Sequence, residues 1–328
     1  MIAYLIRRLL QAIPTLIGVT FISFMIMRLA PGDPIDLITF NPDVTPEQRE
    51  ALKAQFCLDR SLLEQYAIWI VGDFRGVCDI QGLIRGDFGT SIYDRRPVFE
   101  MIAERLPATL QLTAAAFVIG TSIGLGVGVL SAVTRGGIFD NVARFFSVVF
   151  DALPSFWFGL ILIMYFGVNL GWFPTGGRAP IGVQDPTLLQ RVHHLVLPTI
   201  VLAVGWVAVM SRFMRAETLE VMRREYVRTA HAKGLKPGRV YFWHAARNAL
   251  IPIVTIIGPA ILALIGGAVI IERVFTWPGL GRLLLDAVAA RDYPIVMGAV
   301  IIGALIIVVG NMLTDVLLAV VDPRIRLE

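Results

Sequence analysis

The sequence predicts an all-α integral membrane protein with six transmembrane helices. Its 328 residues are 56% hydrophobic and only 16% charged, whereas about a quarter of the residues in a soluble domain carry a charge. Six apolar segments approach or exceed the roughly 20 residues that a helix needs to cross the bilayer core. The net charge of +4 comes from positive residues that cluster between these segments, which indicates membrane topology rather than nucleic-acid binding.

Only two formal charges, Asp151 and Asp315, interrupt the six segments. The fourth segment is the shortest, with 17 residues. The first follows an Arg7-Arg8 pair, exceeds the apolar region of a signal peptide and lacks a small-x-small cleavage site, so we expect a retained helix. In order, the segments are Leu9–Met27, Leu106–Thr134, Phe145–Leu170, Leu195–Ser211, Leu250–Ile271 and Ile295–Val320.

The charges between the segments predict that both termini lie in the cytoplasm. Residues Arg212–Arg247, here called the basic segment, carry nine Lys or Arg against three Glu. Residues 30–105 carry thirteen Asp or Glu against eight Lys or Arg. Because cytoplasmic loops are enriched in Lys and Arg, the basic segment is expected inside and the large loop over 30–105 outside.

The large outer loop is expected to contain short helices and a candidate disulfide. Thr45-Pro46 before acidic residues predicts a helix start, and Leu62–Val71 has the pattern of a second, amphipathic helix. The two cysteines of the chain, Cys57 and Cys78, both fall in this loop. In an oxidising extracytoplasmic space they would form one disulfide, and the alternative is two free thiols.

Gly120, Gly124 and Gly128 recur at every fourth residue of the second segment, which puts them on one helix face. Glycines at this spacing let a neighbouring backbone approach closely. One interpretation is a sliding interface near the translocation path. The other interpretation, which we favour, is static packing of the helix bundle.

Asp151 lies three residues before Pro154 in the third segment. A carboxylate inside a membrane is costly and suggests a functional site, and the proline breaks the helix hydrogen bonds beside it. The alternative, which we favour, is a structural carboxylate bonded to a neighbouring span. Asn311 and Asp315 share one face of the last segment and are likewise expected to bond to a partner element.

The sequence predicts no catalytic, metal or cofactor site in this chain. The adjacent His193 and His194 do not share a helix face, and no Cys, Asp or Glu pattern completes a metal site around them. No Gly-x4-Gly-Lys-Ser/Thr phosphate-binding loop occurs, so any ATP would be bound by a partner. We therefore expect a subunit without enzymatic activity of its own.

The basic segment has the order helix, glycine, turn, aromatic helix. Residues 223–233 contain no Pro or Gly, Gly234 is placed to cap a helix in the left-handed conformation, and residues 239–248 are rich in aromatic side chains. Small side chains in the middle of one helix face suit docking onto another protein, and the alternative is a solvated loop that only sets topology. The face comprises Tyr226, Thr229, Ala230 and Lys233.

This segment resembles the cytoplasmic coupling motif of ABC importer permeases, which is Glu-Ala-Ala, three residues and then Gly. Here the pattern falls on Arg228-Thr229-Ala230, then His231-Ala232-Lys233, then Gly234. The departure at the first two positions and the distance to Ile251-Pro252 resemble the peptide/nickel branch of these permeases. Similar blocks follow in order along the chain: Tyr4–Leu10, Arg28–Pro34, Gly86–Ser91, Arg247–Pro252, Glu272–Gly281 and Asp322–Arg326.

The resemblance implies the first of two dissimilar permease subunits of a dipeptide or oligopeptide importer in the bacterial cytoplasmic (inner) membrane. It implies the type I ABC importer permease fold, with a five-helix core over residues 106–328 and an added N-terminal helix and outer loop over 1–105. The implied partners are a second permease, two ATP-binding cassette subunits that hold ATP and Mg, and an extracytoplasmic solute-binding protein. The implied contacts to the ATPase are Tyr226, Arg228, Thr229, Ala230, Lys233 and Gly234.

Two further segments, Pro31–Pro34 and Glu272–Gly281, are expected at the outer face, where the solute-binding protein would dock or gate. Within the same family, nickel chelates or sugars are alternative cargoes. An alternative from a different class is a proton-coupled secondary transporter, in which Asp151 and Asp315 would relay protons.

Overall fold

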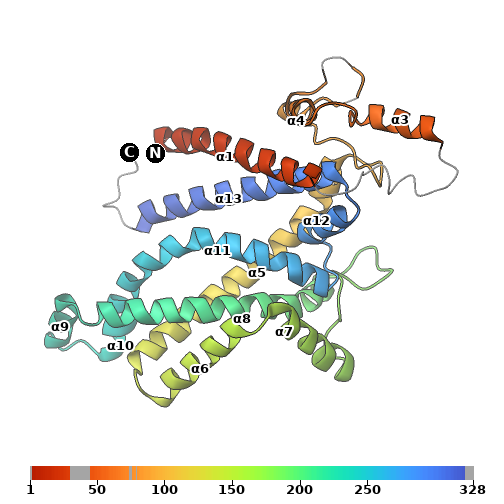
Figure 1. The fold of residues 1–328 in the computed structure, drawn as a ribbon. Helices are drawn as coiled ribbons and strands as arrows, with labels where there is room; N and C mark the ends of the chain where they lie inside the picture. The colour runs from red at the N-terminus through yellow and green to blue at the C-terminus, as the bar shows by residue number, and fades with distance from the viewer. Residues whose placement is uncertain (1, 30–44, 74–75, 79, 322–328) are drawn as a thin grey trace. The chain divides into compact units, whose positions relative to one another are not determined.

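The computed structural model describes residues 2–29, 45–73, 76–78 and 80–321, and these residues are almost entirely helical (Figure 1). Within these ranges the only β pairing is one isolated bridge between Thr90 and Pro97. The chain divides into two compact units. The N-terminal unit comprises residues 2–107 and 279–308, and the core unit comprises residues 108–278 together with the chain from 309 onward.

The two short helices expected in the large loop are confirmed, and both begin with a reciprocal side-chain cap. Thr45 Oγ1 accepts from the Gln48 amide at 3.3 Å, and the Thr45 amide donates to Gln48 Oε1 at 3.1 Å. Ser61 and Glu64 form the same capping box before the second helix. These two helices are α3 (Pro46–Gln55) and α4 (Leu62–Val71). The N-terminal unit also contains α1 (Ile2–Leu29), η1 (Leu83–Arg85), the start of α5 (Val98–Val133), α12 (Leu280–Ala289) and the start of α13 (Tyr293–Val321).

The N-terminal unit has its own hydrophobic core, and residues from the C-terminal part of the chain complete it. Phe24, Trp69 and Phe88 pack in one cluster with Val98 and Met297. In addition, the buried carboxylate of Asp292 accepts hydrogen bonds from Ser91 Oγ at 2.5 Å and from the Tyr93 amide at 3.2 Å. Residues 279–308 therefore pack with the first hundred residues.

The core unit is built around α5, α8 and α11. Buried side chains from these helices, among them Leu112, Met210 and Ile271, form one cluster that also includes Phe275 and Trp277. After α5 the unit contains α6 (Ile138–Ala152), α7 (Ser155–Leu162), the π-helix η2 (Ile163–Asn169), α8 (Leu188–Val221), α9 (Glu225–Ala232), α10 (Pro237–Arg239), the π-helix η3 (Val240–Ala245) and α11 (Ala246–Val274).

The third predicted span, Phe145–Leu170, does not run as one continuous helix. It is divided into α6 and the α7–η2 pair, which are bent by 102° relative to each other. Leu153 and Pro154 between them have extended backbone conformations. Pro154 cannot donate a helical hydrogen bond, and its ring disfavours helix at the preceding residue, which accounts for the break.

Within the described ranges, four helices are long and apolar enough to cross a membrane, and the bent pair would supply a fifth. The fifth predicted span falls inside α11, a helix of 29 residues, although the side chains of 257–263 lie outside the described part. Pro252 lies within α11. The fourth predicted span is twice as long as expected: α8 has 34 residues, or about 50 Å, and reaches into the basic segment.

Candidate functional site

The coupling candidates lie on α9, a short helix close to the range that the sequence predicts. Arg224 at its N-cap is extended, and Gly234 just past its end has a φ of +76°. The Gly234 amide donates to the His231 carbonyl at 2.9 Å, and the Leu235 amide reaches the Ala230 carbonyl at 3.4 Å. A residue with a side chain would be strained in this left-handed conformation, so the helix end requires the glycine.

Almost all of α9 faces outward. Val227 is its one buried residue. The His231 ring packs edge-on against Tyr241 of η3, with centroids 5.4 Å apart. Of the six candidates, Ala230 is half-buried, whereas Tyr226, Arg228, Thr229, Lys233 and Gly234 are exposed.

The charges around α9 form pairs along the same stretch of chain. Arg228 bonds to Glu225 Oε1 at 2.8 Å, and Arg224 bonds to Glu220. Both pairs are exposed, so each contributes at most about 1 kcal/mol to stability. Partial burial raises the pKa of the Tyr226 hydroxyl above its usual range, so this side chain is a neutral donor at physiological pH. The helix therefore presents a hydrogen-bonding surface with no net formal charge, and the flanking residues Arg223, Arg224 and Lys233 are basic.

Two arginines hold the end of α8 that leads into α9. Arg215 binds the buried carboxylate of Asp140 through two bonds, of 2.6 and 2.8 Å. Arg212 bonds to Asp151 Oδ2 at 2.8 Å and to the Ser147 carbonyl at 3.0 Å. These contacts join α6 to α8.

Sequence reasoning missed the pair between Asp140 and Arg215. The sequence did contain a signal, namely two opposite charges at the ends of apolar segments. Asp140 is an acid in the first turn of α6, and Arg215 lies in α8 just past the end of the fourth predicted span. A buried carboxylate requires a charged partner. The pairing itself could not be read from the sequence, because it depends on how α6 and α8 pack together.

Asp151 is paired with Arg212 of the neighbouring helix α8. It also borders a cavity of about 470 Å³ at the break between α6 and α7. Among the described residues that line the cavity, Asp151 is the one with a formal charge, and the others include Phe158, Trp206 and Leu264. Pro154 produces the break at which this cavity opens.

The three glycines of α5 face α8 and are not among the described residues that line this cavity. A Cβ on Gly120 would lie 2.8 Å from Trp206 Cδ1, and one on Gly124 would lie 2.7 Å from Met210 Cβ. A Cβ on Gly128 would lie 2.6 Å from Met214 Cβ. Such distances leave no room for a methyl group, so the spacing serves the close packing of two helices.

The adjacent histidines both hold the loop that follows η2. His193 Nε2 donates to the Trp172 carbonyl at 2.7 Å, and His194 Nδ1 donates to the Gly176 carbonyl at 3.0 Å. The Gly177 amide fixes the same loop by donating to the Phe275 carbonyl at 2.8 Å. The histidines therefore act as hydrogen-bond donors to the backbone.

Most large side chains of the expected docking segment Glu272–Gly281 are buried, although Arg273 is exposed. Glu272, Phe275 and Trp277 are buried, and Trp277 Nε1 donates to the Ala108 carbonyl at 2.9 Å. Glu272 accepts a bond from Thr109 Oγ1 at 2.5 Å. These residues belong to the core. The other expected docking segment, Pro31–Pro34, lies outside the described residues.

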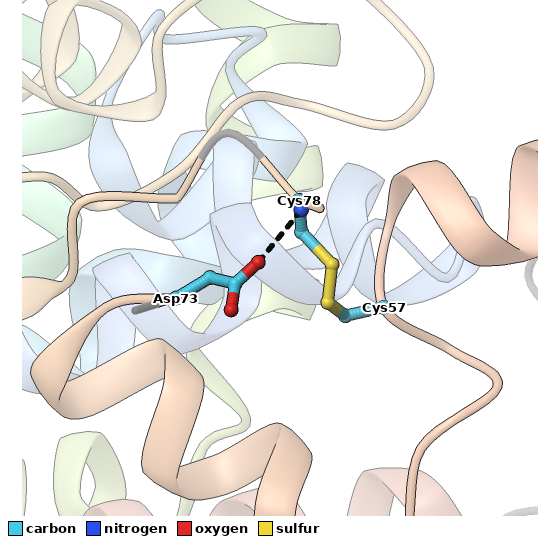
Figure 2. Close-up of side chains that lie close together, drawn as sticks. All are labelled: Cys57, Asp73 and Cys78. Atoms are coloured by element: carbon cyan, nitrogen blue, oxygen red, sulfur yellow. Dashed lines mark hydrogen bonds between the residues drawn. A yellow bond between two sulfur atoms is a disulfide. The ribbon is translucent and has the colours of Figure 1, made fainter. Parts of the chain in front are cut away.

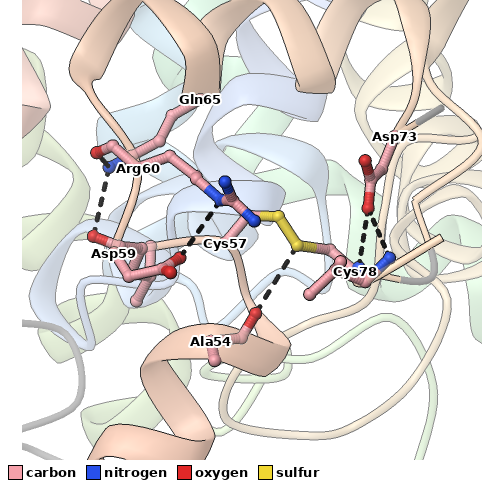
Figure 3. Close-up of a disulfide and its surroundings, with 9 residues drawn as sticks. Ala54, Cys57, Asp59, Arg60, Gln65, Asp73 and Cys78 are labelled. Carbon is pink, nitrogen blue, oxygen red and sulfur yellow. Dashed lines mark hydrogen bonds and ion pairs between the residues drawn. A yellow bond between two sulfur atoms is a disulfide. The ribbon is translucent and has the colours of Figure 1, made fainter. Parts of the chain in front are cut away.

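Cys57 and Cys78 form a disulfide in the N-terminal unit, with Cα atoms 5.8 Å apart (Figure 2). Both side chains are almost fully buried. Asp73 Oδ2 lies close by and accepts from the Val77 and Cys78 amides at 2.7 and 2.8 Å (Figure 3). These three side chains are the one group of potential metal ligands in the described ranges, but the sulfurs are bonded to each other and offer no thiolate.

Two family models match the chain. The model described as the binding-protein-dependent transport system inner membrane component matches residues 124–327. A second model, described as the N-terminal part of the membrane component of such systems, matches residues 1–113. Together the two models cover the chain from its start almost to its end.

Several relatives match over their full length. The oligopeptide transport system permease protein AppB of Bacillus subtilis is 44% identical over 327 residues, which is 99% of this chain and 100% of that protein. The di/tripeptide transport system permease protein DppB of Pseudomonas aeruginosa and the dipeptide transport system permease protein DppB of Escherichia coli K12 are each 38% identical, with 99% of both chains covered.

A solved structure shares the fold at lower identity. The likeness to a chain of the inward-facing MetNI methionine ABC transporter has a TM-score of 0.55 at 21% identity, and it covers 68% of this chain and 96% of that chain. The fold is thus that of an ABC transporter membrane subunit. With the two family models and the full-length relatives, this chain belongs to the family of binding-protein-dependent transport system inner membrane components.

Proposed function

We propose that this chain is a transmembrane permease subunit of an ATP-driven importer of di- or oligopeptides. The observation that carries the proposal is the full-length match to three permeases named for oligopeptide, di/tripeptide and dipeptide transport. The exposed helix α9 supports it, because a permease without a phosphate-binding loop must receive work from a separate ATPase.

In this proposal α9 is the coupling helix. Tyr226, Thr229 and Lys233 contact a groove of an ATP-binding cassette subunit, and the small Ala230 lets the helix enter it. Closure of the ATPases moves α9 as a rigid body. The arginine pairs at the end of α8 then carry the movement to α6, and the cavity at the break beside Asp151 is exposed alternately to the two sides.

The proposal includes the assembly. A second, homologous permease, two ATP-binding cassette subunits and an extracytoplasmic solute-binding protein complete the importer, and ATP and Mg are held by the cassette subunits. The chain crosses the bacterial inner membrane six times with both termini in the cytoplasm, so that α1 is an addition to a five-helix permease core. This orientation is the one in which the basic segment faces the ATPases.

Co-purification followed by reconstitution tests the proposal. Tagged chain should bring down an ATP-binding subunit, and proteoliposomes with the whole complex and its binding protein should accumulate a labelled dipeptide only with ATP inside. Uptake of labelled nickel chelate or sugar, with no uptake of peptide, would show that the assignment of peptides as the cargo is wrong. Uptake by this chain alone, driven by a proton gradient, would replace the importer with a secondary transporter.

That second transporter class would use Asp151, which borders the cavity. The ion pair with Arg212 gives this carboxylate a structural partner on α8 and so a role that needs no proton relay. Asp151→Asn keeps a side-chain oxygen that can accept from Arg212, so the contact between α6 and α8 and ATP-driven uptake should persist, whereas a proton-relay group could not be replaced by an amide.

A further inference from the structure

The core unit contains a pocket of about 380 Å³, here called the basic pocket, that none of the functions above uses. It lies where α5 ends, α6 begins and α8 extends past its apolar part, and in the proposed orientation these helix ends face the cytoplasm. One carboxylate, Asp140, and four arginines line it: Arg135, Arg144, Arg215 and Arg223. The pocket therefore has a formal excess of three positive charges.

The carboxylate of the basic pocket is already used within the protein. Asp140 is buried and accepts both bonds from Arg215, and it also accepts from the Gly136 amide at 2.9 Å. The other three arginines of the pocket are exposed, and no carboxylate of the described residues pairs with them. Several guanidinium groups around one small space favour an oxyanion such as phosphate, which they bind through parallel N–H donors.

An apolar cavity of about 500 Å³ lies next to the basic pocket and is lined by the same three helices. Among the described residues that line it, none has a formal charge, and three hydroxyl side chains are the polar ones. The two spaces adjoin on α6, because Phe139 and Ala143 line the apolar cavity while the next residues, Asp140 and Arg144, line the basic pocket. A ligand with a charged and an apolar part could therefore occupy both.

The dimensions of the two spaces match those of a lipid bilayer. On α8 the apolar cavity extends from Val192 to Ser211, about 28 Å along the helix axis, and the hydrocarbon core of a bilayer is about 30 Å thick. Arg215 follows about 6 Å further on, and the headgroup layer extends about 5–8 Å past the core on each side. When the apolar cavity lies in the hydrocarbon, the basic pocket therefore begins at the headgroups.

We propose that the basic pocket and the apolar cavity together bind one acidic phospholipid. Its phosphate is held by Arg135, Arg144 and Arg223, and an acyl chain lies against Phe139 and Phe146. A net negative headgroup is favoured, because the ammonium group of a zwitterionic lipid would meet the arginines. The lipid lies between α6 and α8, beside the ion pair that joins them. This inference goes beyond the proposed function, since it rests on the chain lying in a membrane and not on the cargo.

Lipid binding to the purified full chain tests the site directly. The chain in detergent is titrated with dioleoyl phosphatidylglycerol, and native mass spectrometry counts the bound lipids. One molecule should bind per chain, and dioleoyl phosphatidylcholine should bind at least about 10-fold more weakly because its headgroup has no net charge. Equal affinity for the two lipids would overturn the role of the arginines and with it the proposal.

Two further ligands distinguish a lipid from a free anion. Dihexanoyl phosphatidylglycerol has the same headgroup on shorter chains, so it should bind at least about 10-fold more weakly than the dioleoyl lipid. Millimolar inorganic phosphate should not displace the dioleoyl lipid, because phosphate gains nothing from the apolar cavity. Displacement by phosphate would show that the pocket takes a free anion, and equal binding of the two chain lengths would show that the apolar cavity takes no part. Either result would overturn the proposal.

Variants of exposed residues locate the headgroup. The combined changes Arg135→Gln, Arg144→Gln and Arg223→Gln leave the buried ion pair in place, so the chain should fold and bind dioleoyl phosphatidylglycerol at least about 10-fold more weakly. An unchanged melting temperature in phosphatidylcholine verifies the fold. Unchanged binding in this triple variant would disprove the site. The matched control removes three exposed positive charges that line neither space: Lys236→Gln, Arg239→Gln and Arg247→Gln.

The assembled complex provides the last test, because a partner subunit could cover the apolar cavity. Phosphatidylglycerol should co-purify with the complex, and the wild-type complex should retain one molecule more than a complex built with the triple variant. If the isolated chain binds the lipid but the two complexes retain equal amounts, a partner occupies the apolar cavity and the proposal falls.

Discussion

Helix α9 and the cavity of about 350 Å³ in the N-terminal unit are opposite kinds of surface. Helix α9 buries one side chain, Val227, and exposes nearly everything else, and it ends at a glycine that fixes its direction. The cavity is lined mostly by apolar and aromatic side chains and by Cys57 of the disulfide. The comparison implies that changes on α9 alter function without affecting stability, whereas changes around the cavity affect stability.

The largest expected effect is on α9. Ala230→Glu puts a long charged side chain in the middle of the proposed docking face, and we expect ATP-driven uptake to fall at least 100-fold with membrane insertion unchanged. Uptake in proteoliposomes and the amount of inserted chain are the measurements. Ala232→Glu is the matched control, because it makes the same change to an exposed residue away from that face. Equal loss in both variants would show that α9 has no specific docking face.

The next largest effect should come from the disulfide. Cys57 and Cys78 are 21 residues apart, and a cross-link over such a loop stabilises by about 3 kcal/mol through the entropy of the unfolded chain. Replacing both with Ser should lower the free energy of unfolding of the N-terminal unit by about that amount. Denaturant unfolding followed by Trp69 fluorescence, in a variant that keeps that tryptophan and replaces the others, measures the loss. Identical unfolding with and without reductant would contradict this prediction.

The third effect concerns the ion pairs that join α6 to α8, the helix that leads into α9. Asp140→Asn leaves Arg215 without its buried partner and should destabilise the core unit by about 2–4 kcal/mol. Asp151→Asn is the control, because the pair with Arg212 is exposed and contributes about 1 kcal/mol or less. Thermal unfolding of the two variants in the same detergent tests the difference. Similar melting temperatures would mean that burial does not distinguish the two pairs.

The sequence predicted the surface features better than the interior ones. Helix α9 and Gly234 were predicted because helix propensity and a left-handed cap are local properties of the chain. The starts of α3 and α4 were predicted for the same reason. By contrast, the packing of residues 279–308 onto the N-terminal unit depends on contacts across two hundred residues, such as Ser91 with Asp292. The bonds between Asp140 and Arg215 and the basic pocket beside them arise only when distant elements meet.

The smallest effect is expected for the packing of α5 against α8 in the core unit. Gly124→Ala places a Cβ 2.7 Å from Met210 Cβ, and overpacking of this kind costs about 1–3 kcal/mol. Gly126→Ala lies on the same helix with nothing within 4 Å, so the gain in helix propensity should make it neutral or slightly stabilising. Unfolding free energies of both variants decide the point. If Gly124→Ala is as stable as Gly126→Ala, α5 and α8 can move apart at little cost, and the sliding interface becomes the better interpretation of the glycine spacing.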